Sequence, residues 1–168
     1  AGVGNKVTAN RQTILDNIAE SQSSRNASRF KMTENPTTRI LSKEDTIATI
    51  KSTRRYVEKL MKNDPIAQNY LSRGRYDNYG TYFHNRVFKR VRSANIEGLE
   101  IDKAIIRPGS TGGKGNTRRP DFQWQQGTAD YELWDLKPNN ASPQFWSDQF
   151  QDLMDWTGQI TTPLKYNR

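Results

Sequence analysis

RRPDF (residues 118–122) and YELWDLKP (residues 131–138) are the two stretches of this sequence that determine its predicted fold. The second stretch alternates as a β-strand does, so Asp135 and Lys137 project from one face and the apolar side chains beside them project from the other. If the first stretch pairs antiparallel with the second, Asp121 lies beside Asp135. The pattern therefore predicts a hairpin that brings two carboxylates and one ammonium group together.

Two carboxylates among Trp, Tyr, Phe and Leu side chains would repel each other and would be costly to bury as bare anions. A divalent cation removes this conflict, and carboxylate oxygens suit Mg²⁺ best, with Mn²⁺ or Zn²⁺ as alternatives. Lys137 lies one step along the same face, where it can orient the attacking water and offset developing charge. These are the components of metal-dependent phosphodiester hydrolysis.

The segment before the hairpin is basic and rich in glycine. The run from Gly109 to Asn116 predicts a flexible loop. It is faintly similar to a phosphate loop, but Gly115 stands where Ser or Thr is needed, so an NTPase is excluded. Lys114, Arg118 and Arg119 lead into the predicted site, where we expect them to bind a nucleic-acid backbone.

Helical patterns occupy the part of the chain before the predicted hairpin. Ser42 followed by Asp45 predicts a capped helix start, and Asp64-Pro65 predicts a second start. A third helix is expected over residues 77–92, with Tyr79, Phe83, Val87 and Val91 on its buried face.

The pattern after Asn95 favours strands, followed by one closing helix over residues 145–156. Phe145, Trp146 and Phe150 of that helix are expected in the core rather than as a base-stacking platform.

The predicted fold class is α+β (α/β-type): a mixed sheet built by residues 99–137 and flanked by the helices over 77–92 and 145–156. We divide the chain into a polar N-terminal extension or linker over 1–42 and a nuclease domain over 43–168. The extension is expected to hold a short helix over about 10–20 and a loop from Ser21 to Pro36. The nuclease domain has a helical part over 43–92 and a catalytic part over 97–156.

Composition narrows the functional classes. Among 168 residues, 26 Lys and Arg against 18 Asp and Glu give a net charge of +8, which favours a polyanionic partner such as nucleic acid. The absence of cysteine excludes disulfides, thiolate metal sites and cysteine nucleophiles. The single histidine argues against His-rich metal sites, and the sequence has no apolar run long enough to span a membrane.

The hairpin motif resembles the PD-(D/E)xK nuclease superfamily, with Pro120-Asp121 followed fourteen residues later by Asp135-Leu136-Lys137. Together with Gly80-Thr81-Tyr82-Phe83-His84, the pattern is similar to the C-terminal endonuclease domains of bacterial polymorphic and contact-dependent inhibition toxins. The resemblance covers residues 76–156. It implies a restriction-endonuclease-like core and DNA as the substrate.

Residue by residue, the resemblance implies that Asp121 and Asp135 are metal ligands and that Lys137 is the catalytic lysine. The family's acidic residue on the first core helix has no counterpart here. His84 stands near its place, and Asp77 is a second candidate.

The same resemblance implies an acidic cognate immunity protein and delivery as part of a larger toxin that acts in the cytoplasm of the target cell. The chain begins with Ala1 rather than Met, which suggests a piece of something longer.

Three alternatives remain open at this stage. The same fold occurs in toxins that cleave transfer RNA or other RNA. Residues 118–137 do not discriminate between the deoxyribose of DNA and the ribose of RNA. A basic nucleic-acid-binding module without catalysis would use Asp121, Asp135 and Lys137 only as structural ion pairs, and would bind with steep salt dependence. A scaffold protein with incidental charge is the third alternative.

Overall fold

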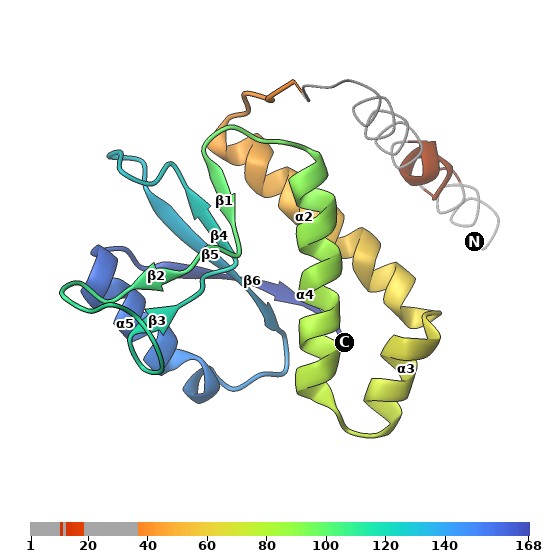
Figure 1. Cartoon of the computed structure of the whole chain (residues 1–168). Helices are drawn as coiled ribbons and strands as arrows, with labels where there is room; N and C mark the ends of the chain where they lie inside the picture. Colours follow the sequence, from red (N-terminus) through yellow and green to blue (C-terminus); the bar gives the residue numbers. More distant parts are fainter. Residues whose placement is uncertain (1–10, 12, 19–36) are drawn as a thin grey trace.

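The computed structural model describes residues 11, 13–18 and 37–168 (Figure 1). Residues 11 and 13–18 are helical, which agrees with the short helix predicted over about 10–20. The loop predicted from Ser21 to Pro36 lies outside the described residues.

From residue 43 onward, helices come first, strands follow, and one helix and one strand close the chain. The elements are α2 (Lys43–Lys62), α3 (Pro65–Ser72), α4 (Tyr76–Ser93), β1 (Leu99–Ile101), β2 (Ile105–Ile106), β3 (Thr117–Arg118), β4 (Phe122–Trp124), β5 (Glu132–Pro138), the 3₁₀ turn η1 (Pro143–Phe145), α5 (Ser147–Thr157) and β6 (Thr161–Tyr166). The α+β class predicted from the sequence is confirmed.

Two helix starts form at the predicted caps. The Ser42 hydroxyl accepts a hydrogen bond from the Asp45 N–H at 3.0 Å and begins α2. Asp64 accepts from the Ile66 N–H at 2.9 Å and begins α3, with Pro65 in the first turn. The other oxygen of Asp64 accepts from Tyr82 and Arg86 of α4, each at 2.8 Å, and so ties the two helices together.

The main sheet is mixed, with strand order β1-β4-β5-β6. β4 lies antiparallel to both β1 and β5, whereas β6 is parallel to β5. Phe122 is paired with Trp134, which confirms the antiparallel pairing expected between residues 121–124 and 131–137.

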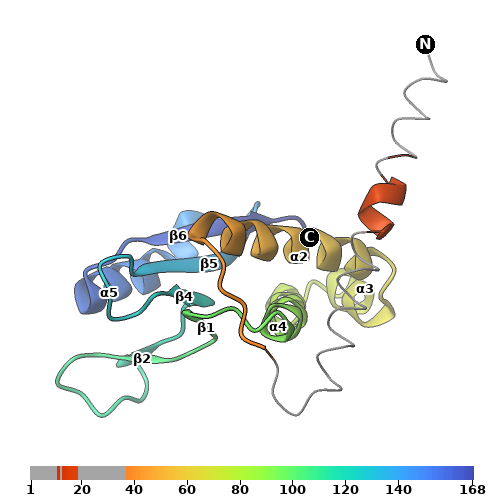
Figure 2. The same ribbon diagram turned by 90° about the horizontal axis from the view of Figure 1, so that it is seen from above.

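The predicted extent of the sheet, residues 99–137, is wrong in two ways. First, β6 adds an edge strand beyond the closing helix, where Pro163 is tolerated because an edge strand need not satisfy both ladders. Second, β2 and β3 leave the main sheet and form their own two-stranded hairpin around the predicted loop. Asp102, with φ of +52°, breaks the chain direction between β1 and β2. Figure 2 shows this hairpin projecting from the body of the protein.

The core lies between the helices α2 and α4 and one face of the sheet (Figure 1). Trp134 and Leu136 of β5 join Leu164 and Tyr166 of β6 on that face. α4 contributes its expected buried face, and α2 contributes three more buried apolar residues. Together these are Tyr79, Phe83, Val87 and Val91 of α4 and Ile50, Val57 and Met61 of α2.

The closing helix differs from its prediction. It begins at Ser147 rather than at residue 145, and Leu153 is its buried residue. Phe145 is 80% exposed and Met154 is 45% exposed, so the expectation that the aromatic stripe belongs to the core is wrong for Phe145. The physical reason is the 3₁₀ turn before α5, which changes the angular position of Phe145 relative to the helix.

Candidate active site

Asp121 and Asp135 lie side by side on neighbouring strands. Asp121 immediately precedes β4, Asp135 lies within β5, and their exposed fractions are 6% and 1%. The Asp121 N–H donates to Asp135 Oδ1 at 2.9 Å, and the Leu136 N–H donates to Asp121 Oδ2 at 2.5 Å. Each carboxylate is thus fixed through one oxygen by a backbone donor of the other strand, which holds the pair rigidly.

The remaining oxygen of each carboxylate faces a basic side chain. His84 Nδ1 lies 3.2 Å from Asp121 Oδ1, and Lys137 Nζ lies 2.6 Å from Asp135 Oδ2. Although the ammonium is close, Asp135 Oδ2 is buried and has no aligned hydrogen-bond donor within the described part of the chain. The Lys137 ammonium, at 2.6 Å, is therefore the charged partner of this buried oxygen.

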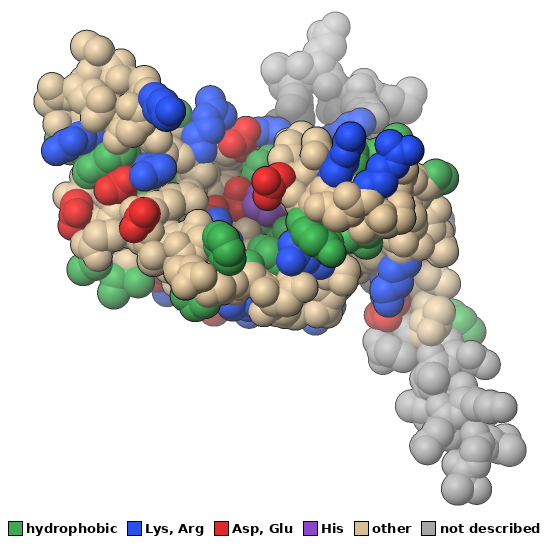
Figure 3. Space-filling view, turned by 90° about the horizontal axis from the view of Figure 1, so that it is seen from below, with side chains coloured by type: hydrophobic (Ala, Val, Ile, Leu, Met, Phe, Trp, Pro, Cys, Tyr) green, Lys and Arg blue, Asp and Glu red, His purple; other side chains and the backbone are tan. Residues whose placement is uncertain are grey.

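His84 reaches this pair from α4. Its ring lies between aromatic neighbours, with centroids 5.9 Å from that of Phe88 and 5.8 Å from that of Tyr166. The side chain is 22% exposed, and Figure 3 shows the histidine in a hollow of the surface beside acidic atoms. Asp77, the second candidate for this position, is exposed in the first turn of α4, about two helical turns before His84.

The proximity of these groups changes their protonation. Burial, followed by the charge of Asp121, raises the pKa of Asp135 to about 7. For Asp121, burial opposes ionisation, but His84 and the hydrogen-bond donors outweigh it and lower the pKa of Asp121. For His84, burial opposes the charged form, but Asp121 outweighs it and raises the pKa of His84. One of the two carboxylates is therefore held ionised while the other resists ionisation.

The donor set fits a hard divalent cation. Two adjacent carboxylates, one with a buried oxygen that lacks a hydrogen bond, match the way Mg²⁺ binds through one or two carboxylates while it keeps water or phosphate oxygens as its other ligands. Within residues 37–168 and the short described helix before them, no three His, Cys, Asp or Glu side chains converge in a way that could hold a metal ion.

The basic residues of the segment before β4 differ in their surroundings. Arg118 forms hydrogen bonds of 2.6 and 2.8 Å with Asp152 of α5. Arg119 lies 3.3 Å from the Asp102 carboxylate. Lys114 is exposed on the glycine-rich loop between β2 and β3. Of the three residues expected to bind nucleic acid, two already have acidic partners.

One further basic residue lies on the same face of the sheet as Lys137 and was missed by the sequence analysis. Lys165 of β6 is in register with Lys137 of β5, so both ammonium groups leave the sheet on the same face. Strand-like alternation over residues 161–166 was a signal for it, but Pro163 in the middle of that stretch argues against a strand.

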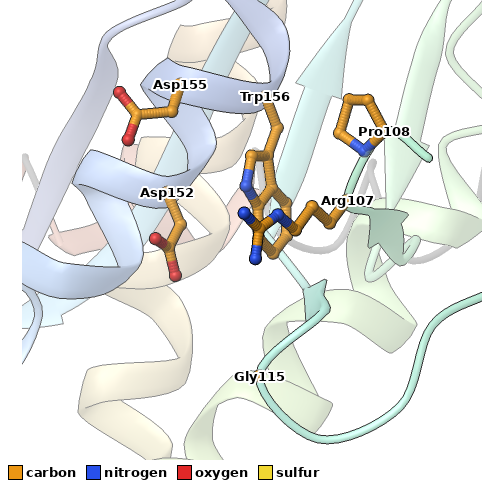
Figure 4. Close-up of a pocket in the computed structure, with 6 residues that line it drawn as sticks. All are labelled: Arg107, Pro108, Gly115, Asp152, Asp155 and Trp156. Atoms are coloured by element: carbon orange, nitrogen blue, oxygen red, sulfur yellow. The ribbon is translucent and has the colours of Figure 1, made fainter. Parts of the chain in front are cut away.

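A separate pocket of about 370 Å³ lies between the β2–β3 segment and α5 (Figure 4). Arg107, Pro108 and Gly115 line it from the side of the hairpin, and Asp152, Asp155 and Trp156 line it from α5. None of the four candidate catalytic residues borders it, and Asp152 is already bound to Arg118. The pocket is therefore separate from the carboxylate pair.

No family model, curated protein or solved structure matches the chain. No helix in the part of the chain that the structure describes is long and apolar enough to cross a membrane.

Proposed function

We propose that this chain is a metal-dependent nuclease with a PD-(D/E)xK core, which hydrolyses phosphodiester bonds of DNA as the toxin domain of a bacterial competition system. The observation that carries the proposal is the pair Asp121 and Asp135, locked by reciprocal backbone hydrogen bonds with Lys137 Nζ 2.6 Å from Asp135. The mixed sheet between α4 and α5 is consistent with the fold that the motif implies.

In this proposal Asp121 and Asp135 would hold a divalent cation, Mg²⁺ being preferred, through their carboxylate oxygens. The cation supplies Lewis-acid polarisation of the phosphate and a more acidic bound water. Lys137 would orient the attacking water and stabilise the negative charge that develops on the phosphate. His84 lies 3.2 Å from Asp121, where it positions this carboxylate and can take or give a proton.

The charge of the chain supports a nucleic-acid substrate. A net charge of +8 attracts phosphates and releases their counterions on binding. The same charge favours an acidic immunity protein that covers the site in the producing cell. We further propose delivery as part of a larger toxin and action in the cytoplasm of the target cell.

The test is a cleavage assay with plasmid DNA and with total RNA, each incubated with Mg²⁺, Mn²⁺ or Zn²⁺ and then with EDTA. We expect cation-dependent cleavage of DNA that EDTA abolishes. The matched control is Asp130→Asn, which changes an exposed acid in the turn of the same hairpin and should cleave as the wild type does.

Cleavage of RNA alone would replace the DNA assignment by the RNA-cleaving alternative. Binding of both polymers with steep salt dependence, but without cleavage under any cation, would show a non-catalytic binding module.

A further inference from the structure

An aromatic cluster lies on the surface beside the candidate active site. It consists of Phe145, Trp146 and Phe150, at the start of α5. Phe145 is 80% exposed, and the other two are partly exposed. The rings of Trp146 and Phe150 lie 4.5 Å apart at an angle of 45°. Single exposed apolar side chains are ordinary, but three aromatic residues within six positions of the chain, two of them in ring contact, offer rings on which a flat group can stack.

Two lysines connect this aromatic cluster to the catalytic residues. Lys137 Nζ lies 5.5 Å from the centre of the Phe150 ring, and Lys165 Nζ lies 5.5 Å from the centre of the Trp146 ring. Both distances are within the range of cation–π attraction. Because Lys137 also contacts Asp135 at 2.6 Å, the aromatic cluster is one side chain away from the carboxylate pair.

Aromatic rings next to ammonium groups match the chemistry of a nucleotide. The ammonium groups attract the phosphate, and the rings offer a stacking surface to any of the bases, worth about 1–3 kcal/mol for each stacked base. In a continuous duplex the faces of the bases are already covered by their neighbours. Only an unpaired base, or one turned out of the stack, can lie on an external ring.

We propose that Phe145, Trp146 and Phe150 form a stacking platform for an unpaired nucleobase next to the scissile phosphate, with Lys137 and Lys165 holding the adjoining phosphates. The inference rests on the proposed nuclease function and narrows its substrate class to nucleic acid in which a base at the cleavage point is unpaired or turned out of the stack.

The test measures binding in EDTA, so that cleavage does not interfere. The probe is an oligonucleotide that contains 2-aminopurine, used single-stranded and as a perfect duplex of the same sequence. The variants are Phe145→Ala, Phe145→Tyr and the control Ile40→Ala, whose side chain is 82% exposed and lies before α2. Thermal unfolding verifies that all three are folded, as expected for exposed positions.

We expect Phe145→Ala to raise the Kd for the single strand by about 5- to 150-fold, which corresponds to about 1–3 kcal/mol of lost stacking. The quenching of 2-aminopurine should be lost with it, whereas the Kd for the duplex should change by less than about twofold on the same scale. Phe145→Tyr and Ile40→Ala should bind the single strand as the wild type does.

An unchanged Kd for the single strand in Phe145→Ala, in a protein that still cleaves DNA, would overturn the platform and leave the nuclease standing. Equal weakening for single strand and duplex would also overturn it, because stacking on unpaired bases would not be the cause. A wild type that neither binds nor cleaves nucleic acid would remove the proposed function, and the platform with it. An effect of Phe145→Ala confined to binding of an inhibitor protein would make this face a protein interface instead.

Discussion

The two faces of β5 perform different tasks. On one face Trp134 and Leu136 are fully buried and belong to the core formed with α2 and α4. On the other face Asp135 and Lys137 form an ion pair beside Asp121. Consecutive residues of one strand thus alternate between stabilising the fold and building the site. Because Trp134 and Leu136 are packed into the core, the strand holds Asp135 and Lys137 in fixed positions on its opposite face.

The energetic balance of the two faces is opposite in sign. Burying a large apolar side chain stabilises the folded state by about 1.5–3 kcal/mol. Burying two adjacent carboxylates destabilises the folded state unless basic partners and hydrogen-bond donors offset the cost of desolvation and repulsion. The pKa of Asp135, raised to about 7, shows that its partners offset this cost only in part. Substitutions on the two faces should therefore separate activity from stability.

The largest expected effect is loss of cleavage in Asp135→Asn. The substitution removes the charge that would hold the proposed cation but preserves the shape of the side chain and its acceptor for the Asp121 N–H. Cleavage in Mg²⁺, followed by gel electrophoresis of plasmid DNA, should fall to the level seen in EDTA. Expression in bacteria should also become harmless. A folded Asp135→Asn protein that still cleaves in Mg²⁺ would overturn the assignment of the site.

The next effect is expected in Lys137→Ala. Because the ammonium acts on water and phosphate, single-turnover cleavage should slow by about 10²–10⁴-fold, while Mn²⁺ binding measured by titration calorimetry is retained. His84→Ala serves as the comparison and should be milder, since this side chain reaches the site through Asp121. Loss of Mn²⁺ binding in Lys137→Ala would assign the lysine to positioning of the carboxylates.

Leu136→Ala probes the opposite face of the strand. Leu136 is fully buried in the core, so the truncation should lower the free energy of unfolding by about 2–5 kcal/mol. The backbone N–H that binds Asp121 is retained. Urea unfolding measures the loss, and cleavage by the remaining folded protein should stay near wild type. A large fall in activity at unchanged stability would show that the two faces are not separable.

A smaller effect is expected in the pH dependence of the free energy of unfolding, and its direction follows from the raised pKa of Asp135. With a pKa raised to about 7, Asp135 contributes stability that is complete below its unfolded pKa near 4 and is lost as the pH rises through 7. Asparagine does not titrate. Relative to the wild type, Asp135→Asn should therefore gain stability between pH 5 and pH 8 in EDTA, measured by urea unfolding at each pH. If the free energy of unfolding of Asp135→Asn instead falls relative to that of the wild type as the pH rises, burial and repulsion do not govern the Asp121–Asp135 pair.

The smallest effect concerns the basic residues of the segment before β4. Lys114 is exposed, whereas Arg118 is bound to Asp152 at 2.6 Å. Lys114→Ala should reduce the slope of log affinity against log salt by about 1, the loss of one phosphate contact. Arg118→Ala should change the slope less, because that charge is already paired. Fluorescence anisotropy with duplex DNA at several salt concentrations measures both slopes. Equal slopes in the wild type and Lys114→Ala would show that the loop between β2 and β3 faces away from the substrate.

Local signals in the sequence were sufficient for much of this architecture. Ser42 and Asp64 begin helices because their side-chain oxygens satisfy backbone donors a few residues away, which is a local property of the chain. The alternation of residues 131–138 predicted the two faces of β5. Asp121 beside Asp135 followed from pairing neighbouring strands across one short connection.

Only the tertiary structure decided the position of β6, the pairing of Arg118 and the exposure of Phe145, because each depends on how separate segments of the chain pack together. Pro163 obscured β6, and only the pairing of that edge strand with β5 places Lys165 in register with Lys137. Asp152 neutralises Arg118 from 34 residues away. Phe145 matched a buried helical stripe until the 3₁₀ turn before α5 placed it in solvent. Sequence periodicity reports which side of an element is apolar, but only packing determines whether another element covers that side.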